Sequence, residues 1–135
     1  RNIVETADYY VGDVSQPLQD LRSGATLRFG HDGNITPLAA LMKIDGFCGE
    51  ELDPEKVEEA WANFKVTPMA SNMQMIFFHP VDGKGPLLVK VMMNEHDAVL
   101  PIPYAAAGAP FYEWPVLRRF LVEQIDAATA VIEKK

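Results

Sequence analysis

A histidine and an aspartate stand side by side between two glycines at residues 30–34, which read Gly-His-Asp-Gly-Asn. A protonated imidazole at His31 can donate hydrogen bonds to phosphate oxygens, and a protonated carboxyl at Asp32 can pass its proton to a leaving oxygen. Gly33 has no side chain, which lets an anion approach the backbone closely. Asn34 would steady the loop or the first turn of a helix behind it. These four residues form the candidate site.

The segments on either side predict that this cluster joins a strand to a helix. Residues 25–29, Ala-Thr-Leu-Arg-Phe, have the apolar character of an interior strand. Thr36 followed by Pro37 predicts a helix start, which we expect to run to about Ile44. Ligands of open α/β sheets bind beyond the carboxyl ends of strands, where the amides of the next helix point outward. Plain turns use the same residue types, so the pattern alone leaves both interpretations open.

The remaining pattern indicates an α/β fold with a mixed sheet flanked by helices. Helical spacing of apolar residues predicts helices over 2–11, 17–24, 53–66 and 115–133. In the third of these, Val57, Trp61 and Phe64 mark the buried stripe; the fourth carries Leu117, Phe120, Leu121, Ile125, Ala128 and Ile132. Residues 71–79 and 87–93 predict an antiparallel hairpin, and 98–102 a short edge strand after a tight turn over 94–97. No linker is evident, so residues 1–135 are expected to be one domain or the C-terminal segment of a larger one.

Composition excludes several classes of partner. The net charge of −7 disfavours nucleic acid and anionic membranes, and no apolar run approaches the roughly 20 residues that span a bilayer. Cys48 is the only cysteine, which excludes an internal disulfide. His79 is expected to be an ordinary edge histidine, and Glu95-His96-Asp97 a solvated turn with no second cluster at ligand spacing. We therefore expect no metal and no organic cofactor.

Four segments of the chain resemble, in order, the C-terminal part of the histidine acid phosphatases, the branch of the histidine phosphatase superfamily that includes phytases. Residues 24–42 contain His31-Asp32-Gly33-Asn34-Ile35, which is similar to the family's His-Asp-Thr-Asn motif and its following apolar residue. Residues 68–78 resemble its Pro-x-Ala-Ser strand, and residues 87–102 its next strand and Asn-containing turn. Residues 112–125 resemble its final helix. The likeness covers nearly the whole chain.

This resemblance implies a phosphoglycerate-mutase-like fold, of which the chain would be the C-terminal part. It implies hydrolysis of organic phosphate esters, with inositol or sugar phosphates as candidates, through a phosphohistidine intermediate. His31 would contact the transferring phosphoryl group, and Asp32 would protonate the leaving alkoxide. Gly33 and Asn34 would lie against the substrate. The family is mostly exported, which implies the periplasm or the outside of the cell.

Two departures from the family pattern matter. Gly33 stands where the family usually has threonine, which implies an altered contact with substrate. The nucleophilic histidine of the family's Arg-His-Gly-x-Arg-x-Pro segment is absent from these 135 residues. We therefore expect that a missing N-terminal part supplies the nucleophile and that this chain alone is inactive. The alternative is a noncatalytic binding or structural module of the same fold; a transferase of the mutase branch is less favoured, because the acid is in the His-Asp form.

Overall fold

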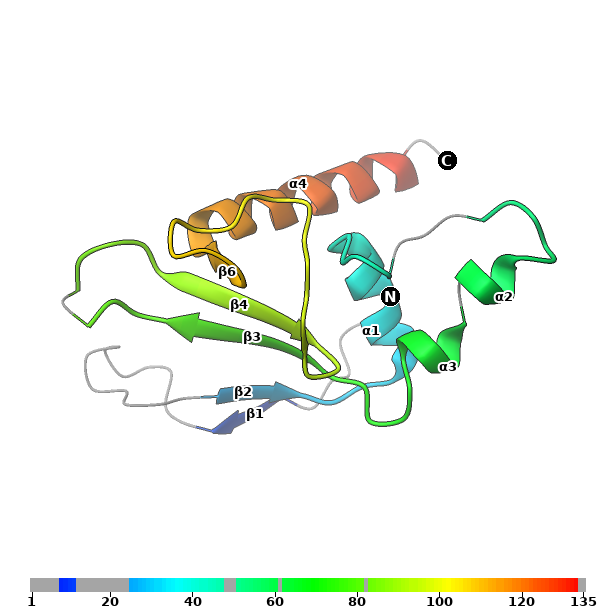
Figure 1. The fold of residues 1–135 in the computed structure, drawn as a ribbon, viewed down its shortest axis with the longest axis horizontal. Helices are drawn as coiled ribbons and strands as arrows, with labels where there is room; N and C mark the ends of the chain where they lie inside the picture. The colour runs from blue at the N-terminus through cyan, green and yellow to red at the C-terminus, as the bar shows by residue number, and fades with distance from the viewer. Residues whose placement is uncertain (1–7, 12–24, 48–50, 61, 82, 134–135) are drawn as a thin grey trace. The chain divides into compact units, whose positions relative to one another are not determined.

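The computed structural model describes residues 8–11, 25–47, 51–60, 62–81 and 83–133 (Figure 1). The elements in chain order are β1 (Asp8–Val11), β2 (Ala25–Arg28), α1 (Asp32–Leu41), α2 (Val57–Ala60), α3 (Asn63–Val66), β3 (Met73–Phe78), β4 (Leu88–Met93), β5 (His96–Asp97), β6 (Phe111–Glu113) and α4 (Trp114–Ile132). The chain divides into two units, residues 1–34 and 35–135. Among the described residues, no helix combines the length and apolar character needed to cross a membrane.

The first unit contains a two-stranded antiparallel ribbon. β1 pairs with β2 in a register that runs from Asp8 opposite Arg28 to Val11 opposite Ala25. The helix predicted over 2–11 is therefore wrong at residues 8–11; its residues 2–7 and the helix predicted over 17–24 lie outside the described residues. β2 confirms the predicted strand. Leu27 is 45% exposed and Phe29 60%, so the expected interior position is wrong, because a two-stranded ribbon has few neighbours to cover its faces.

The second unit is built on the hairpin of β3 and β4, as predicted. Its register runs from Met73 opposite Met93 to Phe78 opposite Leu88. β5 and β6 both pair with the other edge of β4, one at each end of that strand. All described strand pairs are antiparallel, so the mixed sheet was a wrong expectation. The cause is local: short hairpin connections, such as the two-residue turn at Asn94 and Glu95, join strands only in antiparallel fashion.

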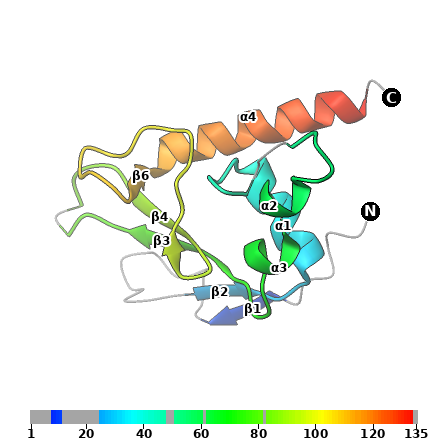
Figure 2. The same ribbon diagram turned by 45° about the vertical axis from the view of Figure 1, so that its right-hand side comes forward.

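The core of this unit lies between one face of the sheet and the helices α1 and α4. Alternate residues of β4 (Val89, Val91 and Met93) are buried on this face, whereas their neighbours are only partly buried. Figure 2 shows α4 beginning beside β6, with its later turns extending beyond the sheet, and its first turns contribute Leu117 and Phe120 to the core. The remaining core residues are Ala39, Met42, Ile44, Ala98, Leu100 and Tyr112.

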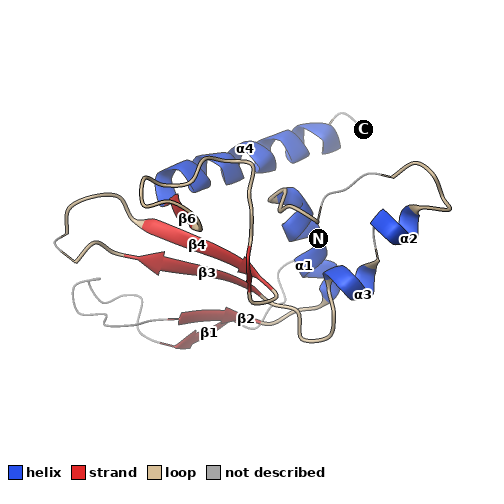
Figure 3. Cartoon of the chain, viewed as in Figure 1, coloured by secondary structure: helices blue, strands red, loops and turns tan. Residues whose placement is uncertain are grey.

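The hydroxyl of Tyr112 fastens an irregular segment to this core. Tyr112 is fully buried on β6, a strand that the sequence pattern did not predict. Its hydroxyl accepts a hydrogen bond from the amide of Leu100 at 3.0 Å and donates one to the carbonyl of Ala98 at 3.2 Å. Residues 98–102 were predicted to be a strand and are not one; β5 ends just before them. Figure 3 shows the connection that leads from there to β6 as loop. Together with the bond from the amide of Ala98 to the carbonyl of Val91 in β4, the tyrosine bonds hold this segment on the core.

Two helix predictions need correction. The expected helix over 53–66 is two short helices, α2 and α3, and its expected stripe is not buried: Val57 is exposed, Phe64 is 73% exposed and Trp61 lies outside the described residues. The residue that α3 buries is Val66. The closing helix is confirmed as α4, but Ile125, Ala128 and Ile132 are exposed because only its first turns reach the core.

The end of α1 has a Schellman motif closed by a lysine. Lys43 has φ of 50°, a left-handed conformation that favours glycine. The amide of Ile44 donates to the carbonyl of Ala39, and the amide of Lys43 to that of Ala40. Ile44 and Ala39 are both in the core, which supplies the apolar contact that accompanies this motif. The helix therefore ends at Leu41, three residues before the predicted end.

Candidate functional site

The four candidate residues lie at the start of α1. The helix begins at Asp32, directly after His31, and not at the predicted cap Thr36. The amide of Asn34 donates to the carbonyl of His31 at 2.9 Å, and the amide of Gly33 donates to Oδ1 of Asp32 at 2.8 Å. These bonds satisfy two donors of the first turn, so the helix starts five residues before the predicted first position, and Pro37 falls inside it.

The side chains at this helix start are open to solvent. His31, Asp32 and Gly33 are exposed, and Asn34 is partly buried. The N-terminus of a helix carries a partial positive charge, because the amide dipoles align along the helix axis. His31 and Asp32 are thus exposed neighbours in the chain at a helix start, where an anion is favoured. The local arrangement suits one group that binds an anion and one that exchanges a proton.

Gly33 is a glycine that the local backbone does not require. It is helical, its φ is not in the left-handed region, and no described atom lies within 4 Å of where a Cβ would be. Glycine within a helix is less favourable than alanine by roughly 0.5–1 kcal/mol. In a plain turn, glycine is favoured because it adopts the left-handed conformation easily. Gly33 does not adopt that conformation. If a ligand binds against this backbone, we expect open space over the Cα of Gly33.

A polar cluster that the sequence did not reveal lies beside α1 in the second unit. The hydroxyl of Thr36 donates to that of Thr67 at 3.4 Å, and the hydroxyl of Thr67 donates to Oδ1 of Asn63 at 2.7 Å. Thr67 was expected only to end a helix, and it does follow α3 directly. No sequence signal pairs Thr36 with Thr67, because they are 31 positions apart.

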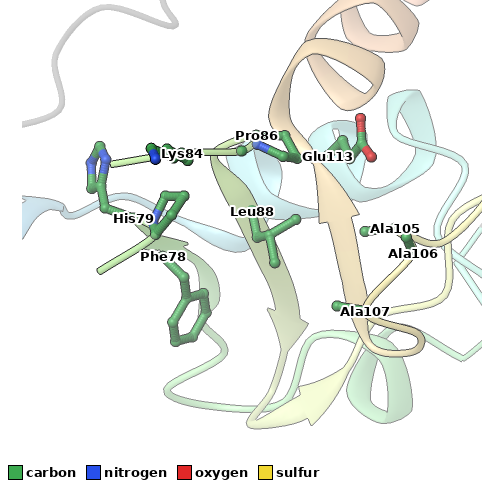
Figure 4. A pocket seen from close by; sticks show the side chains of 11 residues that line it. Phe78, His79, Lys84, Pro86, Leu88, Ala105, Ala106, Ala107 and Glu113 are labelled. Carbon is green, nitrogen blue, oxygen red and sulfur yellow. The ribbon is translucent and has the colours of Figure 1, made fainter. Parts of the chain in front are cut away.

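The second unit also has an open hollow of about 350 Å³ (Figure 4). His79 and Lys84 lie on one side of it and Ala105–Ala107 on the other, with Leu88 between them. None of residues 31–34 lines it. His79 is exposed at the end of β3, in the position expected of an edge histidine.

The other predicted polar clusters also have definite places. His96 and Asp97 form β5 and are not turn residues, since the turn is confined to Asn94 and Glu95. Asp97 is held by an ion pair with Lys90, with 2.6 Å between Nζ and Oδ1. Within the described ranges, no group of three or more His, Cys, Asp or Glu side chains is arranged to hold a metal ion.

Searches of protein-family models and of curated proteins found no match for this chain.

Proposed function

We propose that this chain supplies the general-acid half of an acid phosphomonoesterase of the histidine acid phosphatase type. The phosphoryl group of an organic ester is transferred to a histidine on a separate N-terminal part, and water then hydrolyses the phosphohistidine. No metal or organic cofactor takes part. The resemblance in sequence motivates this proposal. It also implies a phosphoglycerate-mutase-like fold and an exported location, and we include both in the proposal.

Each candidate residue has a defined role in this reaction. His31, when protonated, donates to a phosphoryl oxygen, and the adjacent helix start favours the negative charge. Asp32 protonates the leaving alkoxide as the bond from phosphorus to oxygen breaks. Because an alkoxide is a poor leaving group, a positioned acid accelerates this step by about 10²- to 10⁴-fold. Gly33 and Asn34 lie against the ester.

The observation that carries the proposal is Gly33. Gly33 is helical, lies between Asp32 and Asn34 and has open space around it. It therefore lowers the stability of the helix without improving the packing of other residues. Room for a phosphate beside the backbone accounts for it. The family's threonine at this position would place a hydroxyl in that space, so we expect this protein to contact its ester differently.

The leaving-group dependence of an Asp32→Asn variant tests the acid role in the enzyme that contains the nucleophile. We expect kcat for an alkyl phosphate to fall by about 10²- to 10⁴-fold, and kcat for p-nitrophenyl phosphate to fall far less, because its leaving group needs little protonation. Asp126→Asn, at an exposed position of α4, is the matched control and should change neither rate. Equal losses for both substrates would contradict the acid role of Asp32.

The alternative, a noncatalytic module of the same fold, is favoured by one observation: the 135 residues contain no Arg-His-Gly-x-Arg-x-Pro segment. Finding that segment upstream in the gene would support the enzyme, and its absence from the gene would support the module. The chain alone should not hydrolyse p-nitrophenyl phosphate. Turnover by the chain alone that Asp32→Asn abolishes would overturn the division of the site between two parts.

A further inference from the structure

We propose that two copies of this chain associate through the later turns of α4, with the two helices packed antiparallel. These turns extend beyond the sheet in Figure 2. Every residue from Ile125 to Ile132, where the helix ends, is exposed. Apolar side chains nevertheless continue there, since Ile125 is 52% exposed, Val131 62% and Ile132 74%. Apolar residues this exposed along one helix are typical of a surface that another polypeptide covers.

The spacing of these residues suits a second helix as the covering element. One face of the later turns carries four apolar residues, the α4 stripe: Leu121, Ile125, Ala128 and Ile132. They are separated by four, three and four positions, so they lie above one another along the helix. Leu121 packs against the core, and the other three residues continue the same face past it. Apolar residues that alternate between spacings of three and four are the pattern with which two helices pack side by side.

A second copy of this chain can cover the stripe because the stripe and its margins carry no charge. The chain has a net charge of −7, so two copies repel each other unless they meet through a neutral surface. By the helical repeat, the acidic side chains Glu123, Asp126 and Glu133 point away from the stripe. The residues at its margins are all uncharged: Val122, Gln124, Thr129 and Val131. The hydroxyl of Thr129 already donates to the carbonyl of Ile125 at 2.9 Å, so covering it leaves no donor unpaired.

The sizes of the stripe residues favour the antiparallel arrangement. In an antiparallel pair, Ile125 of one copy faces Ala128 of the second copy, and Leu121 faces Ile132. Each small residue then meets a large one. In a parallel pair, Ala128 would face Ala128 and leave a gap, which close packing disfavours. The antiparallel pair also keeps the two cores apart, because each copy packs on its own sheet only through the first turns of α4.

Sedimentation equilibrium of the 135-residue chain tests the dimer, which does not depend on the proposed function. The stripe is small for a protein interface, so we expect a weak dimer with a dissociation constant in the micromolar range. Ile125→Glu places a carboxylate from each copy in the interface and should raise that constant by about 100-fold or more. Ala127→Glu adds the same charge at an exposed position on another face of α4 and should leave it nearly unchanged. Circular dichroism should show both variants folded. A wild-type chain that remains monomeric at about 1 mM, or equal losses in the two variants, would overturn the proposal; the first result would mean that a different polypeptide covers the stripe.

Disulfide cross-linking tests the antiparallel register without a charged substitution. Ile125→Cys and Ala128→Cys are made as separate chains, each with Cys48→Ser so that the new thiol is the only one. On mild oxidation, a mixture of the two chains should form a cross-linked dimer faster than either chain alone, because the antiparallel register brings positions 125 and 128 together. Faster cross-linking of the Ile125→Cys chain with itself would indicate a parallel pair and would overturn the register. No cross-linking at concentrations where the wild type dimerises would overturn the role of the stripe.

Discussion

Replacing Tyr112 with phenylalanine removes a single oxygen from the centre of the second unit. The hydroxyl is fully buried and bonds both Leu100 and Ala98, so the variant leaves an amide and a carbonyl in the core without this partner. Leaving a buried polar group unsatisfied costs about 1–3 kcal/mol. We therefore expect Tyr112→Phe to lower the free energy of unfolding at pH 7 by that amount. Urea unfolding followed by circular dichroism measures it.

The same residue makes stability depend on pH in the alkaline range. Burial raises the pKa of Tyr112 from 10.0 to about 12, and the neighbouring Tyr104 adds to the rise. The unfolded chain therefore loses this proton at lower pH than the folded chain does. The contribution is fully present below pH 10 and is lost as the pH rises to about 12; it amounts to roughly 2–3 kcal/mol at 1.36 kcal/mol per pH unit.

The two effects combine into one expectation. The difference in stability between the wild type and Tyr112→Phe should be largest at pH 7–9 and should shrink between pH 10 and 12, because only the wild type can ionise at this position. Tyr104→Phe removes the phenolic hydroxyl of an exposed ring tilted against Tyr112; it should change stability at pH 7 by no more than about 0.5 kcal/mol, but it should lessen the rise in the pKa of Tyr112. A difference that is constant from pH 7 to 12, or absent at pH 7, would refute the reasoning.

Three further variants test other parts of the second unit and the start of α1. Lys43→Gly should raise the free energy of unfolding by about 0.5–1 kcal/mol in urea, since glycine adopts the left-handed conformation without strain; a loss would argue against the Schellman geometry. Gly33→Ala should raise it by about 0.5 kcal/mol while weakening the binding of inorganic phosphate, followed by amide chemical shifts. Leu117→Ala should cost about 2–5 kcal/mol, because the side chain is fully buried; a smaller loss would mean that α4 packs loosely.

The parts of the fold that could be predicted are those that local periodicity decides. The hairpin of β3 and β4 and the helix α4 have runs of apolar residues long enough to indicate one structure, and both were confirmed. β6 was missed because it has only three residues and is a strand through its distant partner β4. The start of α1 was misplaced because the rule for Thr-Pro is local, whereas the bonds of Asp32 and Asn34 begin the helix earlier.

The same difference between local and distant signals applies to the candidate site. His31 and Asp32 could be selected by residue type and by neighbouring glycines, since they are adjacent in the chain. The polar contacts of Thr67 and Asn94 could not be selected in this way, because their hydrogen bonds join residues 31 and 28 positions apart. Only folding brings the two residues of each pair close together. Contacts between residues that are far apart in the sequence therefore cannot be read from it, whereas a cluster of polar residues that are neighbours in the chain can be.

The double pairing of β4 has a consequence for how the second unit opens. β3 occupies one edge of this strand, while β5 and β6 share the other edge, each holding a different end. Neither end of β4 is free to fray without also releasing a neighbouring strand. Its amides should be the last of this unit to exchange with deuterium, at a rate set by complete unfolding, and should report the global stability against which every local change is measured.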